Sequence, residues 1–201
     1  MSADVFLLGT NLPVSPENKK DAFSALDPIF AVSPGGLLLS QVCELTGLGA
    51  SAIQNWVKRG WVSRPVGKKY GELQVARILL INLLRPAMHL EDIVTLLGYI
   101  NGNVDDRSDD IIPETRLYSL LCYAIFELEG EIDLSGRSLV SLVEILMTGY
   151  EGPVPDAPSR LNTALNIMLL NVAASKLMQR ASKIYKESVS PEQEIQLKTG
   201  E

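Results

Sequence analysis

The stretch LLLSQVCELTGLGASAIQNWVKRGWVSRPVGKKYGELQVARILLINLLRPAMHLEDIVTLLG, residues 37–98, decides the fold. Apolar residues recur at the spacing of one helical face over Leu38–Leu45, and again over a segment that opens at Ala50 or Ser51 and runs to Arg59. A glycine follows each segment, and glycine is common at helix ends because it adopts positive φ readily. The pattern predicts two short helices joined by a tight turn.

A basic segment and two further helical patterns follow. Trp61–Tyr70 carries strand-forming valines around a turn at Pro65-Val66-Gly67, and this composition predicts a β-ribbon, or wing. Apolar periodicity then predicts helices over Glu72–Leu84, before Pro86, and over Leu90–Leu97, before Gly98. The expected fold is mainly α, with a winged helix-turn-helix head.

The second helix has two unlike faces. Ile53, Trp56 and Val57 lie at i, i+3 and i+4, which predicts one buried face. The other face offers groups that bind bases and phosphates. We expect base contacts from Ser51, Gln54 and Asn55. We expect phosphate contacts from Lys58, Arg59, Arg64, Lys68 and Lys69.

The charge of the chain is unevenly distributed. The whole sequence has a net charge of −6, yet residues 37–86 hold seven basic and two acidic side chains, a local charge of +5. The remainder therefore carries −11. A small basic head on an acidic body is typical of a DNA-binding protein, although a solvated basic face without a ligand would have the same composition.

The order of these motifs resembles the DNA-binding domain of the MerR family. The resemblance lies in LTGLGASAIQNWVKRGWV (45–62), GKKY (67–70), GELQVARILLI (71–81) and MHLEDIVTLL (88–97). It implies a MerR-like winged helix-turn-helix whose second helix enters the major groove. Two places depart from the family pattern: Gln54-Asn55 stands where the family has an arginine and an aromatic or similar residue, and Lys68 stands where it has the arginine of the wing. The whole chain resembles bacterial proteins with a domain of unknown function, which join a MerR-like head to an all-helical tail.

The flanking segments are expected to be helical or polar. A helix is predicted from Ser15 to about Leu26, ended by Asp27-Pro28, because the residue before proline disfavours the helical region. Tail helices are predicted from Pro113 to Leu128, over Leu139–Met147, and from Asp156 to Val189, with an acidic patch at Glu127–Asp133. The predicted division is an N-terminal arm (1–36), the head (37–100), an acidic linker (101–112), an all-helical dimerisation domain (113–190) and a polar tail (191–201).

Several kinds of chemistry find no support in the residues. His89 is the single histidine, no phosphate-binding glycine motif occurs, and Cys43 and Cys122 sit alone in apolar helical patterns. We therefore expect no catalytic residues, no enzyme activity, no metal site and no cofactor. No stretch suits a secretory signal or a membrane span, so we expect a cytoplasmic protein without a membrane partner.

These observations together predict a transcriptional regulator that binds double-stranded DNA as a homodimer. A helix of about thirty residues at the C-terminus exceeds the usual globular length, and a second copy of the chain is its natural partner. Two alternatives stay open: an architectural or excisionase-like DNA-binding accessory protein, and a protein-interaction module that has lost DNA binding. The sequence leaves open an unknown small-molecule effector and marks no site for one.

Overall fold

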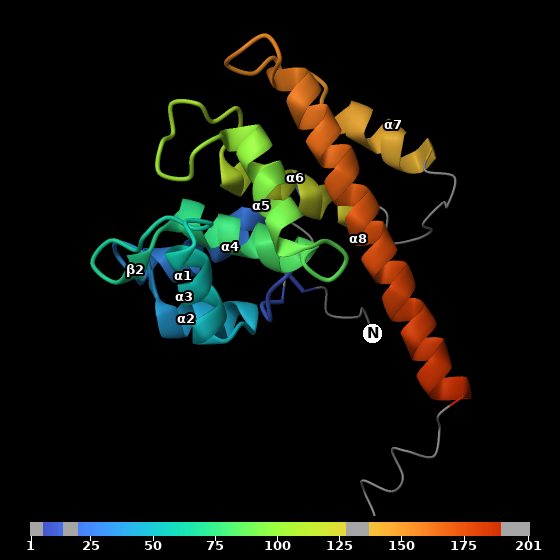
Figure 1. Ribbon diagram of the computed structural model, residues 1–201, viewed down its shortest axis with the longest axis horizontal. Helices are drawn as coiled ribbons and strands as arrows, with labels where there is room; N and C mark the ends of the chain where they lie inside the picture. The colour runs from blue at the N-terminus through green and yellow to red at the C-terminus, as the bar shows by residue number, and fades with distance from the viewer. Residues whose placement is uncertain (1–5, 14–19, 128–136, 190–201) are drawn as a thin grey trace, which may run out of the picture.

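Residues 6–13, 20–127 and 137–189 are described by a computed structural model of the chain (Figure 1). It is mainly helical, and the described residues form one antiparallel sheet of two short strands. The elements in chain order are η2 (Ala22–Leu26), α1 (Asp27–Ala31), β1 (Leu37–Leu38), α2 (Leu39–Thr46), α3 (Ala50–Lys58), β2 (Lys69–Tyr70), α4 (Glu72–Leu84), α5 (Leu90–Asn101), α6 (Glu114–Glu127), α7 (Arg137–Leu146) and α8 (Ala157–Ser188).

Most predicted helices are confirmed to within a residue or two. This holds for α2, α3, α4, α6, α7 and α8. Gly47 and Gly60 follow α2 and α3 with φ of 69° and 73°, which is the conformation expected of glycine at a helix end. The acidic patch at Glu127–Asp133 lies largely outside the described residues, as does the polar tail.

The N-terminal arm differs from its prediction. Residues 14–19 lie outside the described part, and residues 22–26 form a 3₁₀ helix rather than an α-helix. Asp27-Pro28 begins the helix α1 instead of ending one. The prediction was wrong because proline is tolerated in a first helical turn, where the missing N–H would have had no intrahelical partner.

The β-ribbon expected over Trp61–Tyr70 is much shorter than predicted. Its second half, β2, pairs with β1, so that Leu37 faces Tyr70 and Leu38 faces Lys69. The first half forms one bridge, between Val66 and Lys69, whose N–H groups donate to each other's carbonyl oxygens at 3.0 and 2.9 Å. The turn lies one residue later than predicted because both central residues, Gly67 and Lys68, have positive φ.

The helix α5 runs past its predicted end. Gly98 lies inside it, because the buried face formed by Ile93, Leu97 and Ile100 continues beyond the glycine. Asn101 ends the helix with a buried side chain that donates to the carbonyl of Ile112 at 2.7 Å and accepts from its N–H at 3.4 Å. One amide thereby joins the two ends of the predicted acidic linker.

The helix α4 is the centre of the fold. Side chains are buried on every side of it, as expected for a helix that is apolar all round. It packs most extensively against α6 and also contacts α2, α5 and α8. One hydrophobic cluster runs from Leu7 to Ala173, so the helices after residue 112 pack directly on residues 37–100. The division into five parts remains a prediction.

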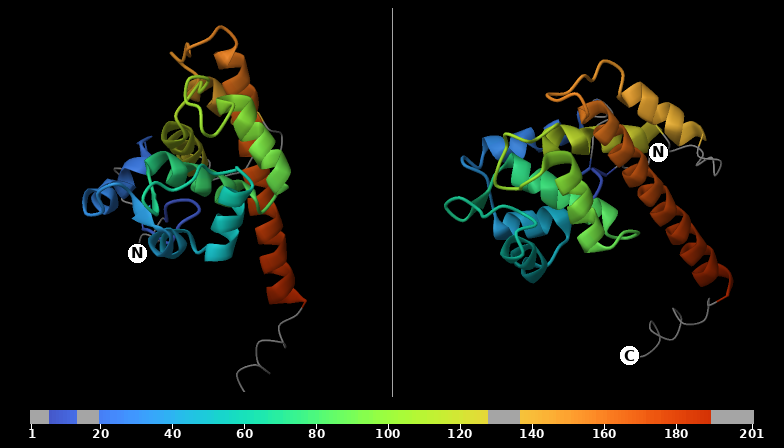
Figure 2. Two further views of the ribbon diagram at one scale, coloured as in Figure 1. Left: turned by 60° about the vertical axis from the view of Figure 1, so that its left-hand side comes forward. Right: turned by 45° about the horizontal axis from the view of Figure 1, so that its top comes forward.

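The helix α8 is the longest described element, at 32 residues and about 48 Å. Its first half packs on the body, and its second half extends beyond the other helices, as Figures 1 and 2 show. Residues 177–189 are all exposed. No described helix combines the length and apolar character needed to cross a bilayer.

Substitution of Gly36 tests the junction between the arm and the sheet. Gly36 has φ of 110°, and a Cβ there would lie 2.3 Å from the carbonyl oxygen of Tyr70. We expect Gly36→Ala to lower the free energy of unfolding by about 2 kcal/mol, measured by urea denaturation. Gly98→Ala is the control, because Gly98 has open space around it inside α5. This variant should raise the free energy of unfolding by about 0.5–1 kcal/mol. Equal losses in the two variants would contradict this geometry.

Candidate nucleic-acid interface

The helix α3 presents one buried and one exposed face. Ile53 and Trp56 are buried in the core, and Leu48, in the turn before the helix, is buried beside them. The predicted base-contacting and cationic residues of this helix lie on its exposed face, as a contiguous polar strip. Its members are Ser51, Gln54, Asn55, Lys58 and, at the end of the helix, Arg59.

The turn between Val66 and Lys69 supplies further cations, but they differ in availability. Arg64 and Lys68 are exposed, as is Lys58 of α3, and among the described residues none of the three has an ion-pair partner. Lys69 is only half-exposed, and its Nζ donates to the carbonyl oxygen of Pro34. This lysine therefore ties the turn to the N-terminal arm.

Arg59 already has two partners. Its guanidinium lies over the ring of Trp61, 4.8 Å from the centroid, and 3.4 Å from a carboxylate oxygen of Glu91 in the first turn of α5. The side chains of Arg59 and Glu91 are 51% and 71% exposed. An ion pair this exposed contributes at most about 1 kcal/mol, so a phosphate could replace the carboxylate at little cost.

Two polar side chains of α4 hold the segment that follows α3. Gln74 donates through Nε2 to the carbonyl oxygens of Ser63 and Arg64, at 3.0 and 2.8 Å. One turn later, Arg77 donates through Nε to the carbonyl oxygen of Trp61, at 2.6 Å. Because buried backbone carbonyls need partners, these bonds fix the path of the chain from α3 to the turn.

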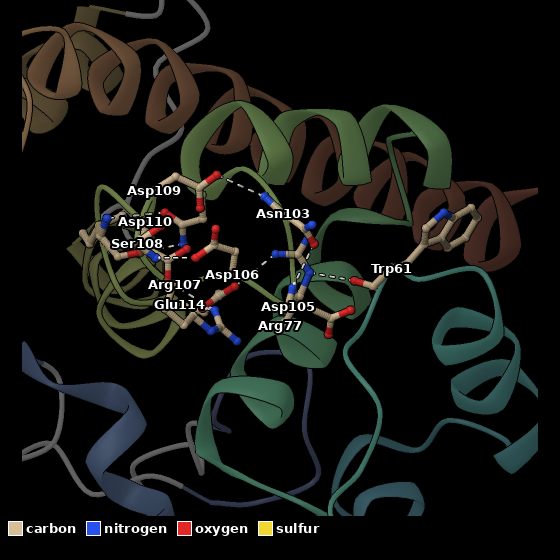
Figure 3. Close-up of polar contacts among 12 residues, drawn as sticks. Trp61, Arg77, Asn103, Asp105, Asp106, Arg107, Ser108, Asp109, Asp110 and Glu114 are labelled. Carbon is tan, nitrogen blue, oxygen red and sulfur yellow. Dashed lines mark hydrogen bonds and ion pairs between the residues drawn. The ribbon is translucent and has the colours of Figure 1, made fainter.

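Arg77 belongs to a buried ionic network, drawn in Figure 3. Its Nη1 lies 3.0 Å from Oε1 of Glu114, and the two side chains are only 3% and 0% exposed. The other oxygen of Glu114 accepts from Arg107 at 2.8 Å, and Arg107 also lies 3.2 Å from Asp110. The network joins the exit of α3, the core helix α4, the loop 102–112 and the start of α6.

The electrostatics of this network are set by desolvation. Burial lowers the pKa of the Arg77 guanidinium, while Glu114 opposes the shift. Burial also raises the pKa of the Asp110 carboxyl, with a further rise from Glu114 and an opposing effect of Arg107. One oxygen of Asp110, Oδ1, is buried without a hydrogen bond to any described residue. The Asp110 carboxylate is thus imperfectly compensated.

The structure also places one arginine of the head and the two cysteines. Arg77 is one of the seven basic residues counted over 37–86, but its charge is buried and neutralised, so it adds nothing to the basic surface. The signal was an arginine inside the otherwise apolar run VARILLI, where a solvated face was not available. Cys122 is buried in the core, and burial raises the pKa of its thiol to about 12, whereas Cys43 is half-buried.

A shallow hollow of about 540 Å³ adjoins the exposed face of α3. It lies between the start of α2, α3 and the turn after it, and its walls are mostly apolar, including Leu38, Val57 and Tyr70. Gln54 and Lys68 line it as well, so the hollow borders two residues of the predicted DNA-binding face. Among the described residues, no group of three His, Cys, Asp or Glu side chains could hold a metal ion.

Removal of the buried carboxylate should be far more costly than removal of the exposed one. Glu114→Gln leaves two guanidinium groups without their shared counter-charge, and we expect a loss of about 3–5 kcal/mol in the free energy of unfolding. Glu91→Gln is the matched control, because it breaks the exposed pair with Arg59 and should cost less than about 1 kcal/mol. Urea denaturation of both variants measures the difference. Similar small losses would show that the network contributes little.

The raised pKa of Asp110 predicts a pH dependence of stability. Between its ordinary pKa of 3.8 and its higher value in the fold, the folded state binds more protons than the unfolded state. This carboxyl therefore makes the protein less stable as pH rises through that range. We expect Asp110→Asn to gain stability relative to the wild type as pH increases from 3 to 7, measured by thermal denaturation across pH. If Asp110→Asn instead loses stability relative to the wild type as pH rises, the direction of the shift is contradicted.

Comparisons with known proteins match only part of the chain. Residues 36–121 match a family model described as "Domain of unknown function (DUF1836)". The uncharacterized protein YkrK of Bacillus subtilis (strain 168) is 36% identical over 91 residues, which are 43% of this chain and 39% of that protein. The chain thus covers well under half the length of this curated relative. No solved structure matches it. The matched family region fits the expected domain of unknown function, and it includes both Arg77 and Glu114 of the buried network.

Proposed function

We propose that this protein is a transcriptional regulator that binds double-stranded DNA as a homodimer. The observation that carries the proposal is the face of α3, where hydrogen-bonding and cationic side chains line one exposed strip, backed by a buried face. A short helix of this kind, preceded by a second helix and a tight turn, suits insertion in the major groove. The proposal includes a MerR-like head with a reduced wing.

Within this proposal the polar side chains divide by role. Ser51, Gln54 and Asn55 contact base edges, and the amides of Gln54 and Asn55 favour adenine, which they can bind with two hydrogen bonds. Lys58, Arg64 and Lys68 contact phosphates, since the described residues offer them no competing ion pair. These phosphate contacts position the helix and make the affinity salt-dependent.

Two of the expected phosphate-binding residues take modified roles in the proposal. Arg59 exchanges Glu91 for a phosphate while it stays stacked on Trp61. Lys69 acts through its bond to Pro34, which sets the position of the turn rather than neutralising a phosphate directly. A homodimer carries two heads related by a two-fold axis, so its operator is a palindrome.

A protein-interaction module is the second candidate, and the hollow beside α3 favours it. Apolar walls between α2, α3 and the turn are suited to side chains of a peptide. The exposed cations of α3 and of the segment that follows it favour DNA instead, since their charges are complementary to those of phosphates. The architectural, excisionase-like alternative uses the same face and differs in what the binding achieves in the cell.

Charge reversal on the α3 face tests the DNA proposal. Wild-type protein is used to select duplexes from a genomic or random library, and its affinity for a selected duplex is measured at several salt concentrations. We expect Lys58→Glu and Lys68→Glu each to weaken binding roughly tenfold or more and to reduce the salt slope by about one. Lys186→Glu is the control, because it makes the same charge change at the exposed far end of α8 and should leave the affinity unchanged.

Two outcomes would contradict the proposal. Wild-type protein without salt-sensitive affinity for any duplex would exclude DNA binding. Equal losses in the Lys186 variant would show that only net charge matters and that α3 is not the binding face. Asn55→Ala adds a test of base contact, since it should relax the preference for A·T at one position of each half-site.

A further inference from the structure

From Leu170 onward, the helix α8 has an apolar face turned away from the body. Leu170, Leu177 and Ile184 are spaced by seven residues and are 53%, 37% and 54% exposed. The body packs on the opposite side of the helix, where Leu161, Leu165 and Met168 are completely buried. No other described element covers the end of α8, where residues 177–188 are exposed and the ribbon extends beyond the body in Figures 1 and 2.

Small residues alternate with these large ones along the same stripe. Ala174, Ala181 and Ser188 are also spaced by seven, and together the six positions follow steps of four and three residues. This is the repeat of a coiled-coil seam, in which one such stripe packs against another helix. The free face of α8 therefore has the pattern of an unpaired coiled-coil helix.

The alternation of size favours an antiparallel pair over a parallel one. In a parallel pair, the small residues would face small residues and the large ones would face large ones, which leaves the layers of alanine and serine underpacked. In an antiparallel pair each large side chain faces a small one, so every layer has a similar volume and the helices pack closely. A second copy of the same stripe therefore fits this face well when it runs in the opposite direction.

The charges beside the seam select a register. Arg180 and Glu187 flank the stripe on one side, and Met178 and Tyr185 flank it on the other. If Ala181 lies opposite Ile184 of the partner subunit, Arg180 lies beside Glu187 of the partner subunit, and symmetry forms this ion pair twice. A shift by one heptad would instead place Arg180 beside Arg180 of the partner subunit. In its own chain, Glu187 has a loose and exposed contact with Lys183, at 3.8 Å.

We propose that the exposed face of α8 over residues 177–188 binds the same face of a second copy, antiparallel, with Ala181 opposite Ile184 of the partner subunit, Leu177 opposite Ser188 of the partner subunit, and two Arg180–Glu187 ion pairs. This inference specifies the interface of the homodimer in the proposed function and does not depend on DNA binding. The bodies lie on opposite sides of the helix pair, because each body packs on the face opposite the seam. In the same register, Met178 packs against Tyr185 of the partner subunit.

A charge swap in the full chain, without DNA, tests the register. Dimerisation is measured by sedimentation equilibrium for the wild type, Arg180→Glu, Glu187→Arg and the double variant. We expect each single variant to raise the dimer dissociation constant roughly tenfold, because it places like charges together twice. We expect the double variant to return to within about threefold of the wild type. Lys186→Glu, off the seam on the same helix, should have no effect, and Ile184→Asp should abolish the dimer.

The other outcomes overturn the proposal. A wild-type protein that stays monomeric at high concentration excludes the interface. If Ile184→Asp leaves the dimer intact, the dimer interface lies elsewhere on the molecule. If the single variants weaken the dimer and the double variant does not restore its affinity, this register is excluded. Binding of the monomer to vesicles with phosphatidylserine would assign the face to a membrane instead. Circular dichroism melts verify that each variant is folded. Salt-sensitive binding of wild type to a half-site duplex tests the DNA proposal separately, so either proposal can fail alone.

Discussion

The buried pair of Arg77 and Glu114 is the constraint on which the rest of the structure depends. Two charged groups with almost no exposure are tolerated only when each finds compensating partners. Glu114 has two guanidinium groups for its two oxygens, and Arg77 adds the carbonyl of Trp61. These partners come from four separate segments of the chain. The pair therefore requires α4, α6, the loop 102–112 and the exit of α3 to be in place together.

This requirement determines how α3 is positioned. Its buried face packs on the core, and its exit is held by bonds from Gln74 and Arg77 to consecutive parts of the segment 61–64. The same guanidinium that fixes Trp61 is bonded to the first residue of α6. A shift of α6 relative to α4 would thus change the partners of Arg77 and, through the Trp61 carbonyl, the path of the chain that leads to Arg64 and Lys68.

Sequence patterns predicted the helices well because each depends mainly on its own periodicity. They failed where distant residues decide the outcome. Gly98 looked like a helix end, but the face that includes Ile100 is buried and α5 packs against both α4 and the distant α8, so the helix continues. The wing was predicted as a hairpin, whereas β2 takes its partner from β1, more than thirty residues earlier. Arg77 was counted with the basic residues of the head, and no local pattern indicated its burial, because its partner, Glu114, lies 37 residues away.

The candidate site was predictable in the same uneven way. Periodicity alone assigns Ser51, Gln54, Asn55 and Lys58 to the face opposite Ile53 and Trp56, and the structure has them on the exposed side. Periodicity could not indicate that Lys69 is bonded to Pro34 or Arg59 to Glu91, since both partners come from other elements.

The distribution of charge follows from the fold in a way that bears on binding. The net charge of −6 opposes approach to DNA, and the charges of Arg77 and Arg107 are already used to neutralise buried carboxylates. The cations that the proposal assigns to phosphate, Lys58, Arg64 and Lys68, are few and belong to α3 and the segment that follows it. A Debye length of about 8 Å at physiological ionic strength screens charges on distant parts of the body far more than charges in direct contact. An acidic body is thus compatible with a basic binding face, provided that the face meets DNA closely, and α3 with its short turn has the exposure to do so.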